Sequence, residues 1–216
     1  MNNMLRNVLA ELVKVGDEVL GLIYDFLRKL NADKTGEFLK MFKLFLRDEV
    51  VAKTSEVWKT WKIIKIGTIY TAEAFCQVFK NEGLDMDRMV KDIIHSPAFR
   101  VSGTEQDVEL VNVSNEQLGF KDGAYYMDTC KRALMLGLDM CPAEVGPQLY
   151  LQLKEDMPSG TSVVVAMEAM LDSENYLKVF TVNCDVRGEL YLLTCICHPH
   201  SKFFAHRRFL FLRRKP

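Results

Sequence analysis

The chain has 216 residues, of which 49% are hydrophobic and 26% are charged, and its 28 basic and 29 acidic side chains give a formal net charge of −1. This composition is typical of a globular protein and excludes a collagen-like chain, a disordered tail and a disulfide-dense mini-domain. The balanced charge argues against polyanion binding over the whole surface but is compatible with a local basic patch.

The beginning of the chain carries acids early and has no uninterrupted apolar stretch, so no secretory signal is predicted. No segment approaches the roughly 18–20 apolar residues of a membrane span. The most apolar run, 163–171, is interrupted by Glu168. The six scattered cysteines are therefore expected to be reduced thiols in core positions. We expect a cytoplasmic protein that does not associate with membranes.

Residues 1–57 have the pattern of amphipathic helices. Apolar residues recur three and four positions apart, in stripes that are separated by Gly16 and by a polar turn near Asn31. The third stripe has five bulky apolar residues between Phe38 and Leu46. Such stripes must be buried against each other, against the rest of the chain or against a partner. We therefore expect 1–57 to bind an unidentified protein or a second copy of the chain.

The segment 58–103 is expected to form a short strand followed by two helices. The alternation of apolar and basic residues over 58–70 is typical of a strand. Thr71 is a suitable N-cap for the first helix, and Asp85 or Asp87 is a suitable N-cap for the second.

The segment 104–216 is expected to form an α+β domain, with a strand over 107–113 and a helix over 124–136. From Gln148 onward, short segments of alternating polarity between turn residues predict an antiparallel β-meander. The whole chain is thus predicted to be α+β, with a helical N-terminal region, a mixed segment and a C-terminal antiparallel meander. The expected meander strands are 148–154, 161–170, 176–182, 189–196 and 208–214, and the expected core residues are Leu149, Leu151, Val163, Val165, Phe180, Val182 and Leu192.

Two stretches of this segment form a distinctive pattern, LGFKDGA at 118–124 and LGLDMCPAEVGPQL at 136–149. With this pattern, the chain resembles a family of small uncharacterised bacterial proteins that are known mainly from environmental small-genome bacteria. No activity is assigned to that family. The resemblance therefore implies an order of elements and a fold, and it implies no function.

Four potential metal ligands lie within six residues, namely Cys195, Cys197, His198 and His200. Zinc prefers four such ligands in a tetrahedral arrangement. On a strand, however, the two cysteines share one face and the two histidines share the other, and the spacing matches no usual zinc template. The alternative is a pair of core cysteines followed by a surface loop. We predict no zinc and no other cofactor.

A second candidate site lies around Cys141, which Glu144 follows closely. A reactive thiolate needs a base or basic neighbours, and the nearby charges in the sequence are acidic. We therefore expect Cys141 to fill the core. A small-molecule pocket near Glu144 and Glu168 is a further alternative. Catalysis is not predicted, because the chain has no nucleotide-binding, metalloprotease, hydrolase or kinase motif.

The segment 198–216 has six cations, no acids and four phenylalanines. Basic and aromatic side chains together are typical of grooves for single-stranded nucleic acid. The alternative is a terminal strand whose phenylalanines enter the core while its cations prevent pairing at a sheet edge. The candidate nucleic-acid-binding residues are Lys202, Arg207, Arg208, Arg213, Arg214 and Lys215.

The leading functional prediction is a non-catalytic protein-interaction module, because the chain lacks catalytic motifs and begins with broad apolar stripes. The alternatives are a nucleic-acid-associated protein that uses the basic C-terminal segment and a protein with a small-molecule site near Glu144 and Glu168.

Overall fold

The computed structural model describes residues 58–84, 86–153, 157–198 and 201–214, together with residues 24, 26–28, 31 and 36. The chain divides into two compact units, Met1–Val51 and Ala52–Pro216. The predictions for 1–57 fall almost wholly outside the described residues. The segment 58–103, expected as a region of its own, belongs to the same unit as 104–216, since its strand pairs with a strand of the later segment.

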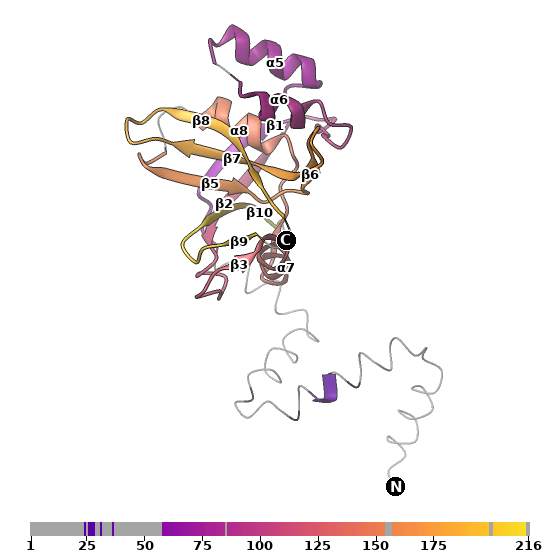
Figure 1. Ribbon diagram of the computed structural model, residues 1–216, viewed down its shortest axis with the longest axis vertical. Helices are drawn as coiled ribbons and strands as arrows, with labels where there is room; N and C mark the ends of the chain where they lie inside the picture. Colours follow the sequence, from indigo (N-terminus) through magenta and orange to yellow (C-terminus); the bar gives the residue numbers. More distant parts are fainter. Residues whose placement is uncertain are drawn as a thin grey trace, which may run out of the picture. The chain divides into compact units, whose positions relative to one another are not determined.

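A mixed, mostly antiparallel sheet forms the centre of the second unit (Figure 1). The strand order is β1-β2-β10-β5-β7-β8, with β4 beside β10 and with β6 beside β7. A separate two-stranded ladder joins β3 to β9. The strands are β1 (Lys62–Ile66), β2 (Gln106–Ser114), β3 (Ala124–Tyr125), β4 (Leu138–Asp139), β5 (Thr161–Val165), β6 (Met170–Leu171), β7 (Leu177–Cys184), β8 (Leu190–Ile196), β9 (Lys202–Phe203) and β10 (Arg208–Arg213).

Helices cover both faces of this sheet (Figure 1). On one face, the Phe180 ring of β7 meets the Phe99 ring edge-on, with centroids 6.3 Å apart. On the other face, Phe209 of β10 meets Tyr126 of α7 at 6.4 Å. The first face carries α5 (Ala72–Asn81), α6 (Arg88–Ile94) and α8 (Val145–Leu153), and the second carries α7 (Tyr126–Met135).

The α+β class is confirmed, but the predicted C-terminal meander is wrong in its order. The last strand, β10, lies between β2 and β5; it is antiparallel to β2 and parallel to β5. The physical reason lies in its burial, because Phe209, Leu210 and Phe211 are all fully buried. A strand that is apolar on both faces is most stable in the interior of a sheet.

A strand was predicted for 148–154, but the described residues 148–153 are helical and form the end of α8, which runs to Leu153. Its alternating sequence also fits a helical face, on which Val145, Leu149 and Leu153 recur four residues apart and are fully buried. The polar side of α8 covers a sheet edge: the Gln152 amide both accepts from the Lys65 backbone N–H at 2.9 Å and donates to the Lys65 carbonyl at 2.7 Å. Tertiary contacts thus stabilise the helix.

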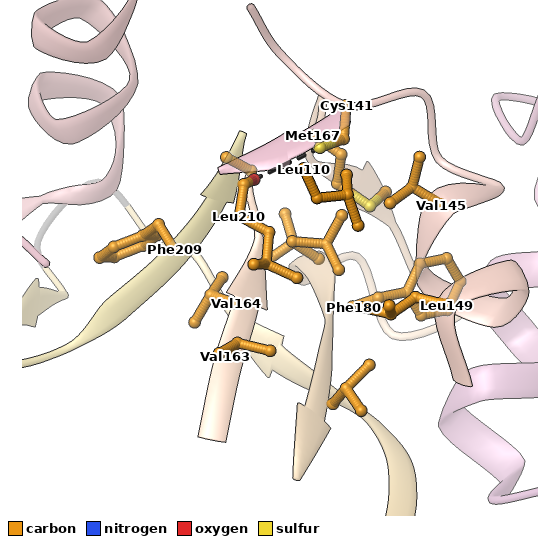
Figure 2. Close-up of a cluster of buried hydrophobic side chains, with 14 of the residues drawn as sticks. Leu110, Cys141, Val145, Leu149, Val163, Val164, Met167, Phe180, Phe209 and Leu210 are labelled. Carbon is orange, nitrogen blue, oxygen red and sulfur yellow. Dashed lines mark hydrogen bonds between the residues drawn. The ribbon is translucent and has the colours of Figure 1, made fainter. Parts of the chain in front are cut away.

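Several local predictions are confirmed. Thr71 Oγ1 accepts from the Ala74 N–H at 3.0 Å, and Asp87 Oδ1 accepts from the Met89 N–H at 2.7 Å, so both N-caps form. Leu151 is only half-buried, but the other predicted core residues are buried: Leu149, Val163, Val165, Phe180, Val182 and Leu192. Figure 2 shows Leu149, Val163 and Phe180 in this cluster.

Candidate functional site

A cavity of about 580 Å³ opens at one end of the sheet, beyond the end of α8. The strands β2, β5 and β10 contribute to its lining, and so do the segment before β1 and the segment after α8. We call it the Trp61 cavity. Its lining residues are Lys59, Thr60, Trp61, Asn112, Met157, Pro158, Thr161, Val163 and Arg208.

The register of the sheet brings the lining residues together. Arg208 of β10 is the register partner of Val163 on the parallel strand β5. On the other side, its Nη1 donates to Asn112 Oδ1 of β2 at 3.4 Å. The Trp61 backbone N–H donates to the Leu110 carbonyl at 2.7 Å, which holds the backbone of residue 61 beside β2 at the entry to β1. Residues far apart in the sequence thus form one concave site.

The chemistry of this cavity suits an anion next to a flat ring. Lys59 and Arg208 are exposed cations, and Trp61 is half-buried with part of its surface facing solvent. Asn112 and Thr161 add hydrogen-bonding groups, and none of the described lining residues is acidic. Guanidinium and ammonium groups bind phosphate by charge-assisted hydrogen bonds, and an indole stacks on bases or cations.

The fold divides the predicted basic C-terminal cluster, and of those members that the structure describes Arg208 alone lines the Trp61 cavity. Arg213 is 3.8 Å from the Glu109 carboxylate. Arg214 donates to Asp139 Oδ1 through both Nε, at 2.8 Å, and Nη2, at 2.7 Å. These two arginines are half-buried rather than fully in water, and carboxylates balance their charge.

The remaining basic candidates lie elsewhere. Arg207 donates through Nη2 to Thr181 Oγ1 at 3.3 Å. Alternation along the strand turns it away from the face of Arg208. Lys202 is exposed on β9, and Lys215 lies outside the described residues. Sequence reasoning missed Lys59 and Trp61, although both belong to the alternating basic and apolar run 58–70.

A second cavity, of about 520 Å³, has Arg100, Cys141 and Glu168 in its lining. Cys141 is buried, and its thiol donates to the Leu210 carbonyl at 3.3 Å (Figure 2). Burial raises the pKa of the Cys141 thiol far above its usual value, with a smaller contribution from Cys130. Cys141 belongs to the cluster of buried core residues, so the expectation that Cys141 fills the core is confirmed.

Glu144 holds two loops together. Its carboxylate is fully buried; Oε2 accepts from the Gly67 N–H at 2.9 Å and Oε1 accepts from the Ser102 N–H at 2.5 Å. These bonds join the turn after β1 to the segment before β2, at the beginning of α8. Glu168, its predicted pocket partner, is exposed and lines the second cavity, whereas Glu144 is not among the residues that line it.

The predicted Cys/His cluster is brought together in part. Cys197 Sγ lies 3.9 Å from the Cys195 carbonyl oxygen; Cys195 is half-buried and Cys197 is buried. His198 follows β8, and His200 is not described. Over the part of the chain that the structure describes, no group of three or more His, Cys, Asp or Glu side chains could hold a metal ion.

Comparison of the chain with known protein families, curated proteins and solved structures finds no match. The resemblance to a bacterial family therefore stays a prediction. Among the described residues, no helix is both long and apolar enough to cross a membrane.

Proposed function

We propose that the protein binds single-stranded nucleic acid and that the Trp61 cavity takes one of its nucleotide units. The observation that carries this proposal is the placement of Lys59, Trp61 and Arg208 around one cavity without a lining acid. In such a complex the indole stacks on a base, and the two cations contact the flanking phosphates. The role is binding, and no covalent step is involved.

The size of the Trp61 cavity fits one nucleotide unit of a single strand better than a free nucleotide. A cavity of about 580 Å³ lies within the usual range of roughly 300–1,000 Å³ for ligand sites. Sites for free nucleotides commonly cradle the phosphates in a glycine-rich loop before a helix, and this chain has no such motif. A unit within a strand needs only backbone contacts and a stacking surface.

Binding is expected to be weak and salt-dependent. With two cations at the cavity, the plot of log K against log salt should have a slope of roughly −1 to −2, at about 0.7 per phosphate contact on a single strand. Replacing Arg208 should flatten that slope by about 0.7. Neutral oligomers and duplexes should bind less well, because neither offers an unstacked base next to a phosphate.

The test is fluorescence anisotropy of a labelled mixed-sequence oligonucleotide, measured with the full chain at low salt and then over a salt series. The Trp58→Phe variant leaves Trp61 as the sole tryptophan, so quenching of its emission reports stacking directly. Arg208→Ser and Trp61→Leu should weaken binding at least several-fold, whereas Trp61→Phe should retain most of it. Arg88→Ser, an exposed arginine on α6, is the charge-matched control.

Two results would refute the proposal: no affinity for single strands at low salt, or an equal loss of affinity in Arg88→Ser and Arg208→Ser. If a free mononucleotide displaces the oligonucleotide at the same total concentration of nucleotides, the cavity is instead a site for a soluble nucleotide.

A specific observation favours protein interaction as a second function. On α7, Met127 and Met135 are 58% and 69% exposed, and Leu134 between them is 37% exposed. Spacings of seven and eight residues place these side chains along one side of the helix, and clustered exposed apolar groups are typical of interaction surfaces. The association role proposed for 1–57 concerns residues outside the described part of the chain and stays a prediction.

A further inference from the structure

The strand β8 lies at one end of the central sheet and has a free edge (Figure 1). In the described part of the chain it pairs with β7 alone, along its whole length from Leu190 to Ile196. Its sequence, LYLLTCI, contains no charged residue and no proline. Proteins commonly protect an edge strand with lysine, with proline or with a covering segment, because an unprotected edge pairs with another strand.

The opposite end of the sheet is protected by charge and by a covering side chain. The strand β1 carries Lys62 and Lys65. The Gln152 amide of α8 accepts from the Lys65 N–H and donates to the Lys65 carbonyl, so it occupies both backbone groups of that residue. Another strand therefore cannot extend the sheet beyond β1 without displacing α8, and the strand available for pairing is β8.

The hydrogen bonds at the two ends of the β7–β8 ladder show which backbone groups point to the free edge. At one end the Asp185 N–H donates to the Glu189 carbonyl at 2.9 Å, and at the other the Cys197 N–H donates to the Leu177 carbonyl at 2.8 Å. Hydrogen-bonded and non-hydrogen-bonded pairs alternate along an antiparallel ladder. The odd-numbered residues of 189–197 therefore bond to β7, and the even-numbered residues turn their N–H and C=O groups away from it.

Three of these even-numbered residues have unpaired backbone groups. The Leu190 carbonyl accepts from the Tyr150 hydroxyl at 3.2 Å. Within the described residues, the N–H and C=O groups that Leu192, Thr194 and Ile196 turn to the edge make no hydrogen bond. The Thr194 Oγ1 is buried and also lacks a partner there. The edge thus presents a row of donors and acceptors, centred on Thr194, that another strand would satisfy.

The side chains along this edge are apolar and partly accessible. Tyr191 and Ile196 are 41% and 44% exposed, and Leu193 is half-buried. The apolar surface continues onto α6, where Met89 is 51% exposed. Met89 Sδ accepts from Nζ of Lys178, the register partner of Ile196, at 3.4 Å. An exposed apolar surface around an open strand edge is typical of a protein-interaction site.

We propose that β8 pairs with β8 of a second copy of the chain, so that two sheets join into one across a two-fold axis at Thr194. Antiparallel pairing sets Thr194 opposite the partner subunit's Thr194 and Leu192 opposite the partner subunit's Ile196. All three outward-facing residues of each copy then form hydrogen-bonded pairs, with two backbone hydrogen bonds in each pair. This interface is separate from the Trp61 cavity and does not depend on nucleic-acid binding.

A second copy fits this edge because the edge is complementary to itself. The axis passes through the middle one of three outward-facing residues, so it leaves none of them unpaired. The strand has no charge, so no like charges meet across the axis. Threonine side chains in opposite positions form hydrogen bonds, and the axis therefore gives Thr194 Oγ1 a partner. Assembly stops at two copies, since Gln152 and α8 cover the other edge of each sheet.

The first test is sedimentation of the native full-length protein over a concentration series from about 1 μM to about 1 mM, which covers weak specific association. The chain has a mass of 24.8 kDa, and the expected product has twice that mass. Ile196→Lys places a charge opposite the partner subunit's Leu192 and should weaken the dimer at least tenfold. Val186→Lys is the matched control, because it adds the same charge at an 86% exposed apolar residue in the β7–β8 turn, off the paired edge.

A second variant and a measurement without any variant identify the paired edge. Thr194→Pro removes an outward N–H without removing a hydrogen bond to β7, as edge strands tolerate, and it should abolish the dimer. Circular dichroism establishes that each variant is folded. In the native chain, the amides of Leu192, Thr194 and Ile196 should exchange at least tenfold more slowly at high than at low protein concentration. The amides of Leu193 and Cys195, which bond to β7 in monomer and dimer, should change less.

Three results would overturn the proposal. The first is a native protein that stays monomeric throughout the concentration series. The second is a folded Ile196→Lys or Thr194→Pro variant that dimerises as tightly as Val186→Lys. The third is a dimer in which the amides of 192, 194 and 196 exchange equally fast at low and high concentration, because the contact then lies elsewhere, on 1–57 or on α7.

Discussion

Gly146 of α8 lies so close to Phe180 of β7 that a Cβ atom at position 146 would be 2.6 Å from Cδ2 of the ring. The same atom would be 2.7 Å from Phe180 Cβ and Cγ. Side-chain carbons do not approach each other this closely. The absence of a side chain at 146 therefore allows the first turn of α8 to pack directly on the sheet.

Gly146→Ala is expected to destabilise the protein by about 1–3 kcal/mol, because the added methyl group forces either α8 or Phe180 to move within a packed core. Gly103→Ala is the matched control, since a Cβ there would have no heavy atom within 4 Å. It should change stability by no more than about 0.5 kcal/mol. Urea unfolding followed by circular dichroism measures both, and equal effects would contradict this packing argument.

Glu144→Ala should lower the free energy of unfolding more than most single substitutions do. It leaves the N–H groups of Gly67 and Ser102 without their acceptor. An unsatisfied buried N–H costs about 1–3 kcal/mol, so a loss of roughly 2–6 kcal/mol is expected for the two N–H groups together. Glu144→Gln keeps one acceptor oxygen and should lose less. Glu168→Ala, at the exposed carboxylate, is the control for thermal unfolding and should be nearly neutral.

The secondary structure of α8 could not be predicted from its local sequence. The sequence 145–153 fits both a strand and a helix: a strand would place Leu149, Leu151 and Leu153 on one face, and a helix places Val145, Leu149 and Leu153 on one face. The deciding contacts are made by Gln152 with Lys65, 87 residues away. No local signal predicts that pairing, whereas the caps at Thr71 and Asp87 depend only on neighbouring residues and were predicted correctly.

The same limit applies to β10 and to the Trp61 cavity. The sequence shows that residues 209–211 are all apolar, so both faces of this strand are apolar. The place of β10 between β2 and β5, however, depends on strand pairing across about half the chain. Arg208 was predicted as a binding residue from the local composition. Lys59 and Trp61 were missed because only the folded sheet brings them to Arg208.

Asp172 and Lys178 form an ion pair at 3.2 Å, with side chains only 4% and 6% exposed. Burial acts to raise the pKa of Asp172, but hydrogen bonds from the Tyr176 N–H, Lys178 and the Glu174 N–H outweigh it, so the pKa lies below its usual value. Asp172→Asn leaves Lys178 without its counter-charge. The expected loss at neutral pH is roughly 3 kcal/mol, the lower end for a buried pair.

The pH dependence of that loss has a definite sign. A carboxyl group whose pKa is lower in the folded state contributes its full stabilisation above the unfolded pKa, near 4, and loses it as the pH falls through the folded pKa. The difference between native protein and Asp172→Asn should therefore shrink as the pH falls below about 4. Urea midpoints at several pH values test this. Glu105→Gln, in the exposed pair with Lys65, should show little effect, and a constant difference for Asp172→Asn would contradict the argument.

A chain that begins at Ala52 is expected to fold on its own, because the structure divides after Val51. It should unfold cooperatively, with a midpoint close to that of the full chain, and it should retain the 3.1 Å bond from Trp58 Nε1 to the Leu136 carbonyl. A chain that begins at Ile63 loses Trp58 and Trp61 and should be clearly less stable. Light scattering of the full and the Ala52 chains then tests association, and two monomers would show that 1–57 is not an association surface.

The C-terminal arginines give the sharpest test of where the basic segment acts. Arg213 and Arg214 pair with Glu109 and Asp139 in half-buried ion pairs, and such pairs are worth about 0–1 kcal/mol each. Replacing both with Ser should therefore lower the free energy of unfolding by no more than about 2 kcal/mol. It should leave oligonucleotide affinity and its salt slope unchanged, whereas Arg208→Ser should reduce both. Anisotropy and urea unfolding of the two variants measure this contrast. If the double variant loses affinity as strongly as Arg208→Ser, the nucleic-acid site extends along the whole of β10, and the Trp61 cavity is not its centre.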